Sequence, residues 1–164
     1  MATVIAAIAT AAAPAGIGII RLSGKGATAI ADKVFSPAVA GRTLDSLSGY
    51  RAVYGHVKDE NGVFDECVAT VFRAPHSYTG EDVVELSCHG GLYLLQRALR
   101  ALLNEGAEPA EAGEFTRRAF VAGKMGLSAA EALGDLLEAK THAAQRLARA
   151  GLDGKLEKKT GELF

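Results

Sequence analysis

Residues 50–73, YRAVYGHVKDENGVFDECVATVFR, contain two runs rich in β-branched and aromatic residues on either side of Asn61-Gly62. An Asn-Gly pair between two such runs is typical of a tight β-hairpin, because both residues accept the left-handed backbone that the turn requires. Two consecutive antiparallel strands do not fit the strand–helix alternation of a doubly wound parallel sheet. The stretch therefore predicts strands over 50–57 and 63–73 and an α+β fold.

Further strands and helices flank this hairpin in the sequence. Apolar runs and helical spacing of apolar residues predict strands over 3–9, 17–23 and 82–88 and helices over 25–35 and 92–104. The predicted order is β-β-α-β-β-β-α. Such an order is typical of α+β domains and not of alternating parallel sheets.

The C-terminal part of the sequence is expected to be helical from about residue 114. Ser128-Ala-Ala-Glu has the sequence of a capping box, which predicts that a helix begins at Ser128. Apolar residues then recur at three- and four-residue steps as far as Leu147, so one long amphipathic helix is expected. Its apolar stripe needs a partner. We therefore expect a first domain over 1–122, followed over 123–164 by the truncated beginning of a helical domain, unless an oligomer covers the stripe.

Composition argues against several classes of function. The 18 basic and 19 acidic residues give a formal net charge of −1, without the basic excess that holds nucleic acid by its phosphates. Two cysteines and four histidines stand at no metal-ligand spacing, so neither a disulfide framework nor a metal site is expected. The first basic residue, Arg21, comes too late for a secretory signal, and no apolar run is long enough to cross a membrane. A cytoplasmic protein without a membrane partner is expected.

Three short motifs are explained more simply by backbone geometry than by chemistry. Gly24-Lys-Gly-Ala-Thr-Ala has the loose form of a dinucleotide-binding loop, but the strands that follow form a hairpin and not the parallel unit that such a loop needs. Gly123-Lys124 lacks the Ser or Thr of a P-loop, so we expect this chain alone to have no GTPase activity. His89-Gly-Gly is not accompanied by a nucleophile elbow. No catalytic residue is proposed.

Three charged residues stand where apolar or glycine neighbours surround them. Arg21 lies in the middle of the strand over 17–23, and Glu85 lies in the middle of the strand over 82–88. Lys124 follows a glycine in a loop between two helices. Such charges are more often solvated or paired than bound to a ligand, but a charge in an apolar strand is also a candidate binding residue.

Three segments closely resemble one protein family. They are ATAAAPAGIGIIRLSG (9–24), SYTGEDVVELSCHGG (77–91) and AGEFTRRAFVAGKMGLSAAEALGDLLEAKT (112–141). In this order they resemble the N-terminal part of the bacterial and organellar tRNA-modification GTPases, the TrmE/MnmE family. The resemblance extends over nearly the whole chain.

The resemblance implies a fold and a cofactor. It implies a β2-α-β3-α domain like one half of the folate domain of glycine-cleavage aminomethyltransferases, binding a tetrahydrofolate derivative such as 5-formyl- or methylene-tetrahydrofolate. Two copies are expected to form a homodimer around the folate. Arg21, Glu85 and Lys124 match the family's folate contacts, and a carboxylate can accept two hydrogen bonds from the pterin edge. Ala112 and Gly126 depart from the Pro and the acidic residue usual in the family.

The resemblance also implies a larger protein. A central helical domain would carry a GTPase domain that uses K⁺ and Mg²⁺, and this chain lacks that domain. With the flavoprotein partner MnmG (GidA), the whole protein would add an aminomethyl-type group to C5 of the wobble uridine of tRNA. Two alternatives stand beside this expectation: a free-standing folate-dependent one-carbon transferase, and a dimerisation module with a vestigial folate site.

Overall fold

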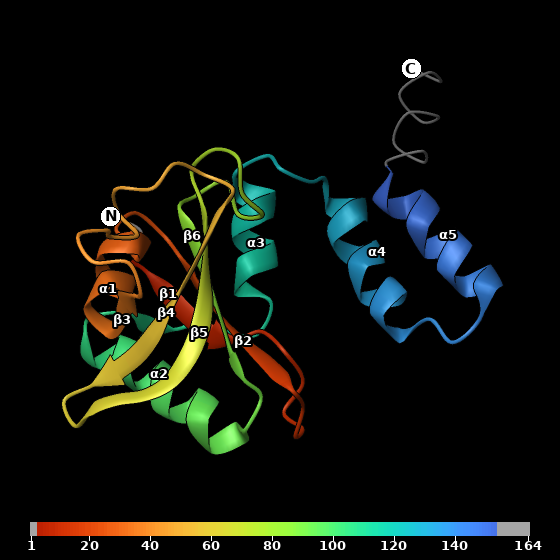
Figure 1. The fold of residues 1–164 in the computed structure, drawn as a ribbon. Helices are drawn as coiled ribbons and strands as arrows, with labels where there is room; N and C mark the ends of the chain where they lie inside the picture. The colour runs from red at the N-terminus through yellow and green to blue at the C-terminus, as the bar shows by residue number, and fades with distance from the viewer. Residues whose placement is uncertain (1–2, 154–164) are drawn as a thin grey trace. The chain divides into compact units, whose positions relative to one another are not determined.

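The computed structural model describes residues 3–153, which divide into two compact units, one ending at Ala112 and the other beginning at Gly113 (Figure 1). The division falls before α3 (Glu114–Val121), whereas the sequence placed it between 122 and 123. The reason is that α3 packs with α4 (Leu127–Glu138) of the helical unit. The charged stretch over 154–164 lies outside the described residues.

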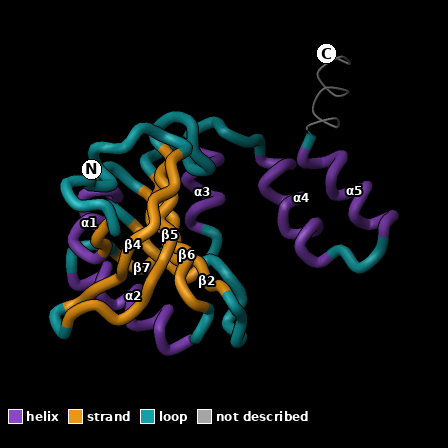
Figure 2. The backbone as a smooth tube through the Cα atoms, in the orientation of Figure 1, coloured by secondary structure: helices purple, strands orange, loops and turns teal. Residues whose placement is uncertain are grey.

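The first unit is built on a seven-stranded mixed sheet with the strand order β3-β4-β5-β6-β2-β1-β7 (Figure 2). Its strands are β1 (Ile5–Ile8), β2 (Ile17–Ser23), β3 (Phe35–Pro37), β4 (Arg51–Asp59), β5 (Gly62–Phe72), β6 (Val83–His89) and β7 (Glu108–Pro109). The helices of the chain are α1 (Ala27–Val34), α2 (Leu92–Asn104), α3 (Glu114–Val121), α4 (Leu127–Glu138) and α5 (His142–Leu152). Among the strands of residues 3–153, only β1 and β7 pair in parallel. The predicted α+β class is confirmed.

The hairpin predicted around Asn61-Gly62 is formed by β4 and β5, which pair antiparallel along nearly their whole length. Gly62 adopts a positive φ of 103°, as a tight turn requires. The register shifts between Val57 and Lys58, where a β-bulge adds twist near the turn. The hairpin places β5 beside β6 and so extends the sheet beyond the strands that carry Arg21 and Glu85.

Alternation along the strands gives the sheet a core face and an open face. Ile20 of β2 and Leu86 of β6 are fully buried on the core face, where both α1 and α2 pack. Among the described residues of the first unit, no helix packs on the open face. By strand alternation the open face carries Ile17, Ile19 and Arg21 of β2, Glu85 and Ser87 of β6, and Tyr54, His56, Glu66 and Val68 of β4 and β5.

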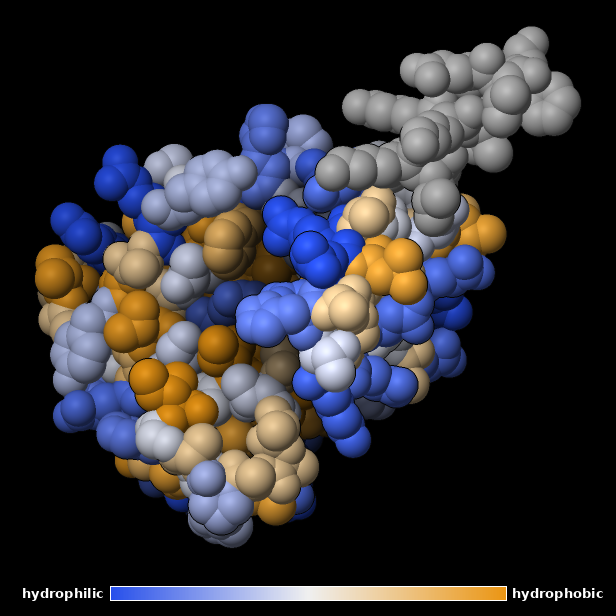
Figure 3. Space-filling view, turned by 90° about the vertical axis from the view of Figure 1, so that its right-hand side faces the viewer, coloured by the Kyte–Doolittle hydropathy of each residue, from blue (hydrophilic) through white to orange (hydrophobic). Residues whose placement is uncertain are grey.

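Large apolar side chains remain exposed on the open face. The exposed fractions are 64% for Ile17, 49% for Tyr54 and 39% for Val68. Figure 3 shows the molecule from the right-hand side of Figure 1, where hydrophobic residues are spread over the surface of the sheet unit among hydrophilic ones. Apolar residues gathered on one face mark a surface that binds a ligand or another protein.

The helical unit differs from the single long helix that the sequence predicted. The chain breaks between α4 and α5, and the Thr141 side chain caps α5 by accepting a hydrogen bond from the Ala144 backbone N–H at 3.2 Å. The capping box is not formed either: Gly126 is the N-cap of α4, and Ser128 lies inside the helix. A capping residue in the middle of the apolar pattern ends one helix and begins another, so α4 and α5 pack on each other.

No helix among residues 3–153 is long and apolar enough to cross a membrane.

Candidate functional site

Arg21 and Glu85 form an ion pair at the centre of the open face. They are directly opposite each other in the antiparallel pairing of β2 and β6. Arg21 Nε donates to Glu85 Oε1 at 2.8 Å, and Arg21 Nη2 lies 2.7 Å from the same oxygen. The two side chains are 28% and 21% exposed. Because Arg21 engages Oε1, the second carboxylate oxygen of Glu85 is the acceptor that a ligand would use.

The loop over 73–82 closes one end of this site. The Tyr78 ring lies over the Arg21 guanidinium, with 5.4 Å between the guanidinium carbon and the ring centroid. Thr79 and Ser23 are fully buried, and their hydroxyl oxygens lie 2.7 Å apart. Ser23 also donates to Glu81 Oε2 at 2.7 Å. The β2 end near Ser23 is therefore occupied by protein, whereas the Arg21–Glu85 pair stays partly accessible.

An ion pair between Arg73 and Asp82 connects the two ends of this loop. Arg73 Nη1 pairs with Asp82 Oδ2 at 2.8 Å, and the Ala74 backbone N–H donates to Asp82 Oδ1 at 2.9 Å. Beside the loop a hollow of about 830 Å³ is bordered by Lys25, Glu81 and Asp82, among other residues. These contacts join the two ends of the loop that carries Tyr78.

Lys124, the third predicted ligand residue, lies in the helical unit. It is exposed in the loop between α3 and α4, as the sequence predicted, and its backbone N–H donates to the Ala119 carbonyl at 2.9 Å. The preceding Gly123 has a positive φ of 68°. The structure thus brings Arg21 and Glu85 together within the first unit and places Lys124 in the second.

Asp65 and His89 form a second charged pair on the sheet, one that the sequence did not reveal. Asp65 Oδ1 lies 2.6 Å from His89 Nδ1, and Asp65 Oδ2 accepts the His89 backbone N–H at 3.1 Å. Oδ1 also accepts the Glu66 backbone N–H at 2.9 Å. The hydrogen bond that His89 donates to Asp65, together with the negative charge of Asp65, raises the pKa of His89 above its usual range. The two residues are 24 positions apart in the sequence, so their contact can be recognised only once β5 is known to pair with β6.

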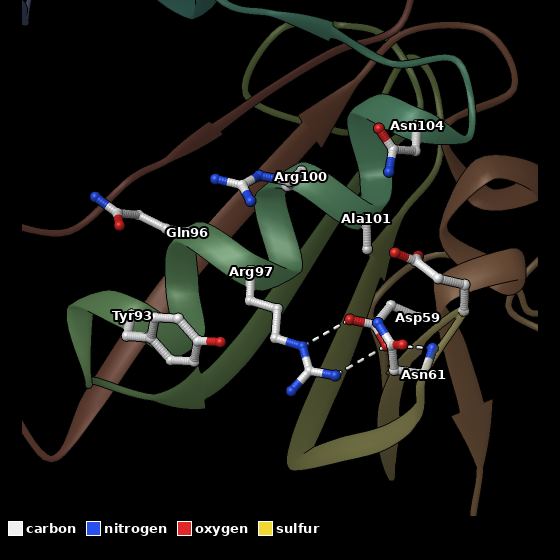
Figure 4. A pocket seen from close by; sticks show the side chains of 9 residues that line it. Asp59, Asn61, Tyr93, Gln96, Arg97, Arg100, Ala101 and Asn104 are labelled. Atoms are coloured by element: carbon white, nitrogen blue, oxygen red, sulfur yellow. Dashed lines mark hydrogen bonds and ion pairs between the residues drawn. The ribbon is translucent and has the colours of Figure 1, made fainter.

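A polar hollow of about 370 Å³ lies against α2 (Figure 4). Arg97 reaches from α2 to the hairpin and binds Asp59 with both Nε and Nη2, at 2.6 and 2.9 Å. Its guanidinium also lies 4.2 Å from the Phe64 ring centroid. The hydrogen bonds from Arg97 lower the pKa of Asp59 below its usual range. This pair ties the hairpin to α2.

The structure supports the simpler explanation of the glycine motif and of the cysteines. Gly24 has a φ of 138°, and a Cβ there would lie 2.9 Å from the Val4 Cα, so the turn and the close approach require glycine. Cys67 and Cys88 are free and buried. A hydrogen bond to Cys88, together with burial, raises the pKa of Cys67, which keeps its thiol protonated. No cluster of metal-ligating side chains occurs within the described part of the chain.

Fold and site together define the class: an α+β domain with two helices on one sheet face and a carboxylate–guanidinium pair on the other. A family profile described as "GTP-binding protein TrmE N-terminus" matches residues 4–124. Similar proteins include the tRNA modification GTPases MnmE of Symbiobacterium thermophilum (49% identity over 97% of this chain and 35% of the relative) and Clostridioides difficile (42%, over 97% and 34%). The chain belongs to the TrmE/MnmE family, as the N-terminal region, and spans about a third of the length of these relatives.

Proposed function

We propose that this chain is the tetrahydrofolate-binding, dimerising N-terminal portion of a tRNA-modification GTPase. The observation that supports this proposal most directly is the Arg21–Glu85 ion pair. It lies at the centre of a sheet face on which no described helix of the first unit packs. A partly exposed carboxylate beside a cation fits the donor edge of a pterin, because Glu85 keeps one oxygen that Arg21 does not use.

Other parts of the reduced folate match the surroundings of this pair. The exposed side chains of Ile17, Tyr54 and Val68 supply apolar surface for the flat rings of the ligand. Lys124 is the proposed third contact, as a cation for the polar or anionic groups of the folate. The likeness to one half of an aminomethyltransferase folate domain belongs to the same proposal.

The whole protein, of which this chain corresponds to about a third, is proposed to hydrolyse GTP and to modify tRNA. Its relatives are tRNA modification GTPases by name. A flavoprotein partner, K⁺ and Mg²⁺ belong to that larger assembly in the cytoplasm. This chain supplies the one-carbon carrier site and a dimer contact, and the wobble-uridine chemistry takes place with the other domains.

Calorimetric titration of the chain with 5-formyltetrahydrofolate tests the folate proposal. We expect saturable binding with a stoichiometry of one folate per chain. Absence of binding at millimolar ligand would leave the vestigial-site alternative. Transfer of the one-carbon group by this chain alone to an added amine acceptor would instead favour the free-standing transferase.

A further inference from the structure

We propose that Thr70 on β5 is a further binding residue of the folate site, and that its hydroxyl donates a hydrogen bond to the 4-oxo group of the pterin. This inference rests on the proposed folate function and deepens it. Glu85 takes the two N–H donors at one edge of the pterin, and Thr70 takes the oxygen at the end of the same edge. Together the two side chains recognise the whole edge.

The register of the sheet places Thr70 directly beside Glu85. Arg21, Glu85 and Thr70 are consecutive cross-strand partners on β2, β6 and β5. Directly opposite residues of an antiparallel pair share a sheet face, with their Cβ atoms about 4.5–5.5 Å apart. Glu85 is therefore flanked by a cation on its β2 side and by a hydroxyl on its β5 side. Since Arg21 Nε and Nη2 both engage Oε1, the second oxygen of Glu85 and the Thr70 hydroxyl remain for a ligand.

The Thr70 hydroxyl is open to such a contact. Its neighbours along β5, Ala69 and Val71, are fully buried in the core, so alternation turns Thr70 to the open face. Within residues 3–153 the Thr70 hydroxyl makes no hydrogen bond, and in the same part of the chain no buried side-chain polar atom lacks a partner. Because Thr70 is half-buried, its unpaired hydroxyl therefore keeps contact with solvent.

The chemistry of the pterin edge requires a donor beside the carboxylate. The 2-amino group and N3–H of the pterin are donors, and the 4-oxo group next to them is an acceptor. An ionised carboxylate has no hydrogen to give, so Glu85 matches only the first two positions. A hydroxyl can donate, so Thr70 completes the array on the side of Glu85 that Arg21 does not occupy.

The surroundings set the direction in which the pterin ring extends from this edge. Toward Val83 the face is closed by Ser23 and Thr79, which are fully buried and hydrogen-bonded to each other. In the other direction the next residues on the open face are Ser87 and Val68, which are cross-strand partners. Ser87 has a small side chain, and Val68 is 39% exposed and apolar. The flat rings therefore lie over Ser87 and Val68.

Two ligands and three variants test this inference on the intact chain. Affinities for 5-formyltetrahydrofolate and for a tetrahydropterin without the aminobenzoyl-glutamate tail are measured by calorimetry for wild type, Thr70→Val, Thr70→Ser and Ser87→Ala. Valine keeps the branched shape of threonine without its hydroxyl. We expect Thr70→Val to weaken both ligands by the same factor, about three- to tenfold, the range for an uncharged hydrogen bond. Thr70→Ser should restore most of this affinity, and Ser87→Ala, the matched change of a neighbouring hydroxyl, should leave it unchanged.

Four results would overturn the inference. A loss for 5-formyltetrahydrofolate alone would place Thr70 at the tail of the ligand. Unchanged affinity for both ligands in Thr70→Val with a wild-type melting temperature would place the oxo group on the Arg21 side of Glu85. Failure of Thr70→Ser to recover affinity, or an equal loss in Ser87→Ala, would attribute the effect to packing of the sheet face. If the wild type binds neither ligand, the proposed folate function itself fails, and the role of Thr70 fails with it.

Discussion

At the scale of single residues, Glu85 can serve the ligand or the fold, since its carboxylate already accepts hydrogen bonds from Arg21. In Glu85→Gln the side chain keeps its size, but one acceptor oxygen becomes a donor that faces the donor edge of a pterin. We expect the affinity for 5-formyltetrahydrofolate to fall by about 1.5–3 kcal/mol, or roughly 10- to 150-fold.

Stability distinguishes the two roles of Glu85. A partly exposed ion pair contributes on the order of 0–1 kcal/mol to folding, so the melting temperature should change little. Glu60→Gln, a matched change at the hairpin turn, should alter neither quantity. A well-folded Glu85→Gln protein with wild-type folate affinity would remove Glu85 from the site, and a large drop in melting temperature would make it a structural residue.

Asp59 is expected to contribute to the stability of the fold, because it joins the hairpin to α2 through Arg97. Its pKa is lowered in the folded chain, so its contribution to stability is present above its unfolded pKa and is lost as pH falls through the folded value. We expect Asp59→Asn to lower the melting temperature at pH 7 and the difference from wild type to narrow below about pH 4. Thermal unfolding followed at both pH values checks this; a difference that does not depend on pH would show that the charge of Asp59 is irrelevant.

The sequence pattern identified Arg21 and Glu85 because each interrupts an apolar alternation, a signal contained within one strand. It did not identify Asp65 and His89. Their contact depends on the register between β5 and β6, and His89 comes at the end of its strand, where alternation gives no signal. Partners on different strands are visible only when the strands are paired.

At the scale of elements, the number of residues in a strand or helix decided whether the sequence could predict it. The five strands and two helices predicted in the first unit are confirmed, with shifts of a few residues at their ends. β3 has three residues and β7 has two, which is too short for a period of two to be recognised. The sequence did not predict the helix break at Thr141, because Lys140 has the pattern of a single polar interruption in a continuing apolar stripe.

The helix break gives a prediction with its own control. Thr141→Ala removes the cap that accepts the Ala144 N–H, and should destabilise α5 by about 1 kcal/mol. Ser128→Ala should cost nothing or stabilise slightly, because Ser128 lies within α4 and alanine is the better helix former. Hydrogen exchange at the first turns of α4 and α5 measures both. Faster exchange in Ser128→Ala than in Thr141→Ala would restore the capping box.

At the scale of the whole molecule, the structure shows which apolar surfaces are open to a second copy. The apolar strand β1 is not one of them, because it lies inside the sheet and Ile5 is 2% exposed. The predicted helical stripe is partly covered by the packing of α4 on α5, although Leu137 and Leu147 remain 81% and 77% exposed. The open face keeps an apolar patch, defined here by Ile17, Tyr54 and Val68.

Of these two surfaces, the open-face patch is the one we expect to form the dimer. Tyr54 and Val68 are cross-strand partners, so their side chains form one continuous apolar surface beside the proposed folate site. A second copy placed there would enclose the proposed ligand, whereas Leu137 and Leu147 belong to the other unit. Burial at a stable interface takes about 800 Å² from each partner, more than three side chains supply, so the contact must extend across neighbouring strands.

Sedimentation of the chain at low micromolar concentration should therefore give about twice its mass of 17.0 kDa. Replacing Tyr54 and Val68 together by lysine should shift the equilibrium to monomer, because two charges would have to be buried without partners. The matched double change of Leu137 and Leu147 to lysine should leave the dimer intact. If only the double change of Leu137 and Leu147 converts the dimer to monomer, the interface lies on α4 and α5 and not on the open face. A wild-type monomer that still binds 5-formyltetrahydrofolate would show that one copy suffices for the site.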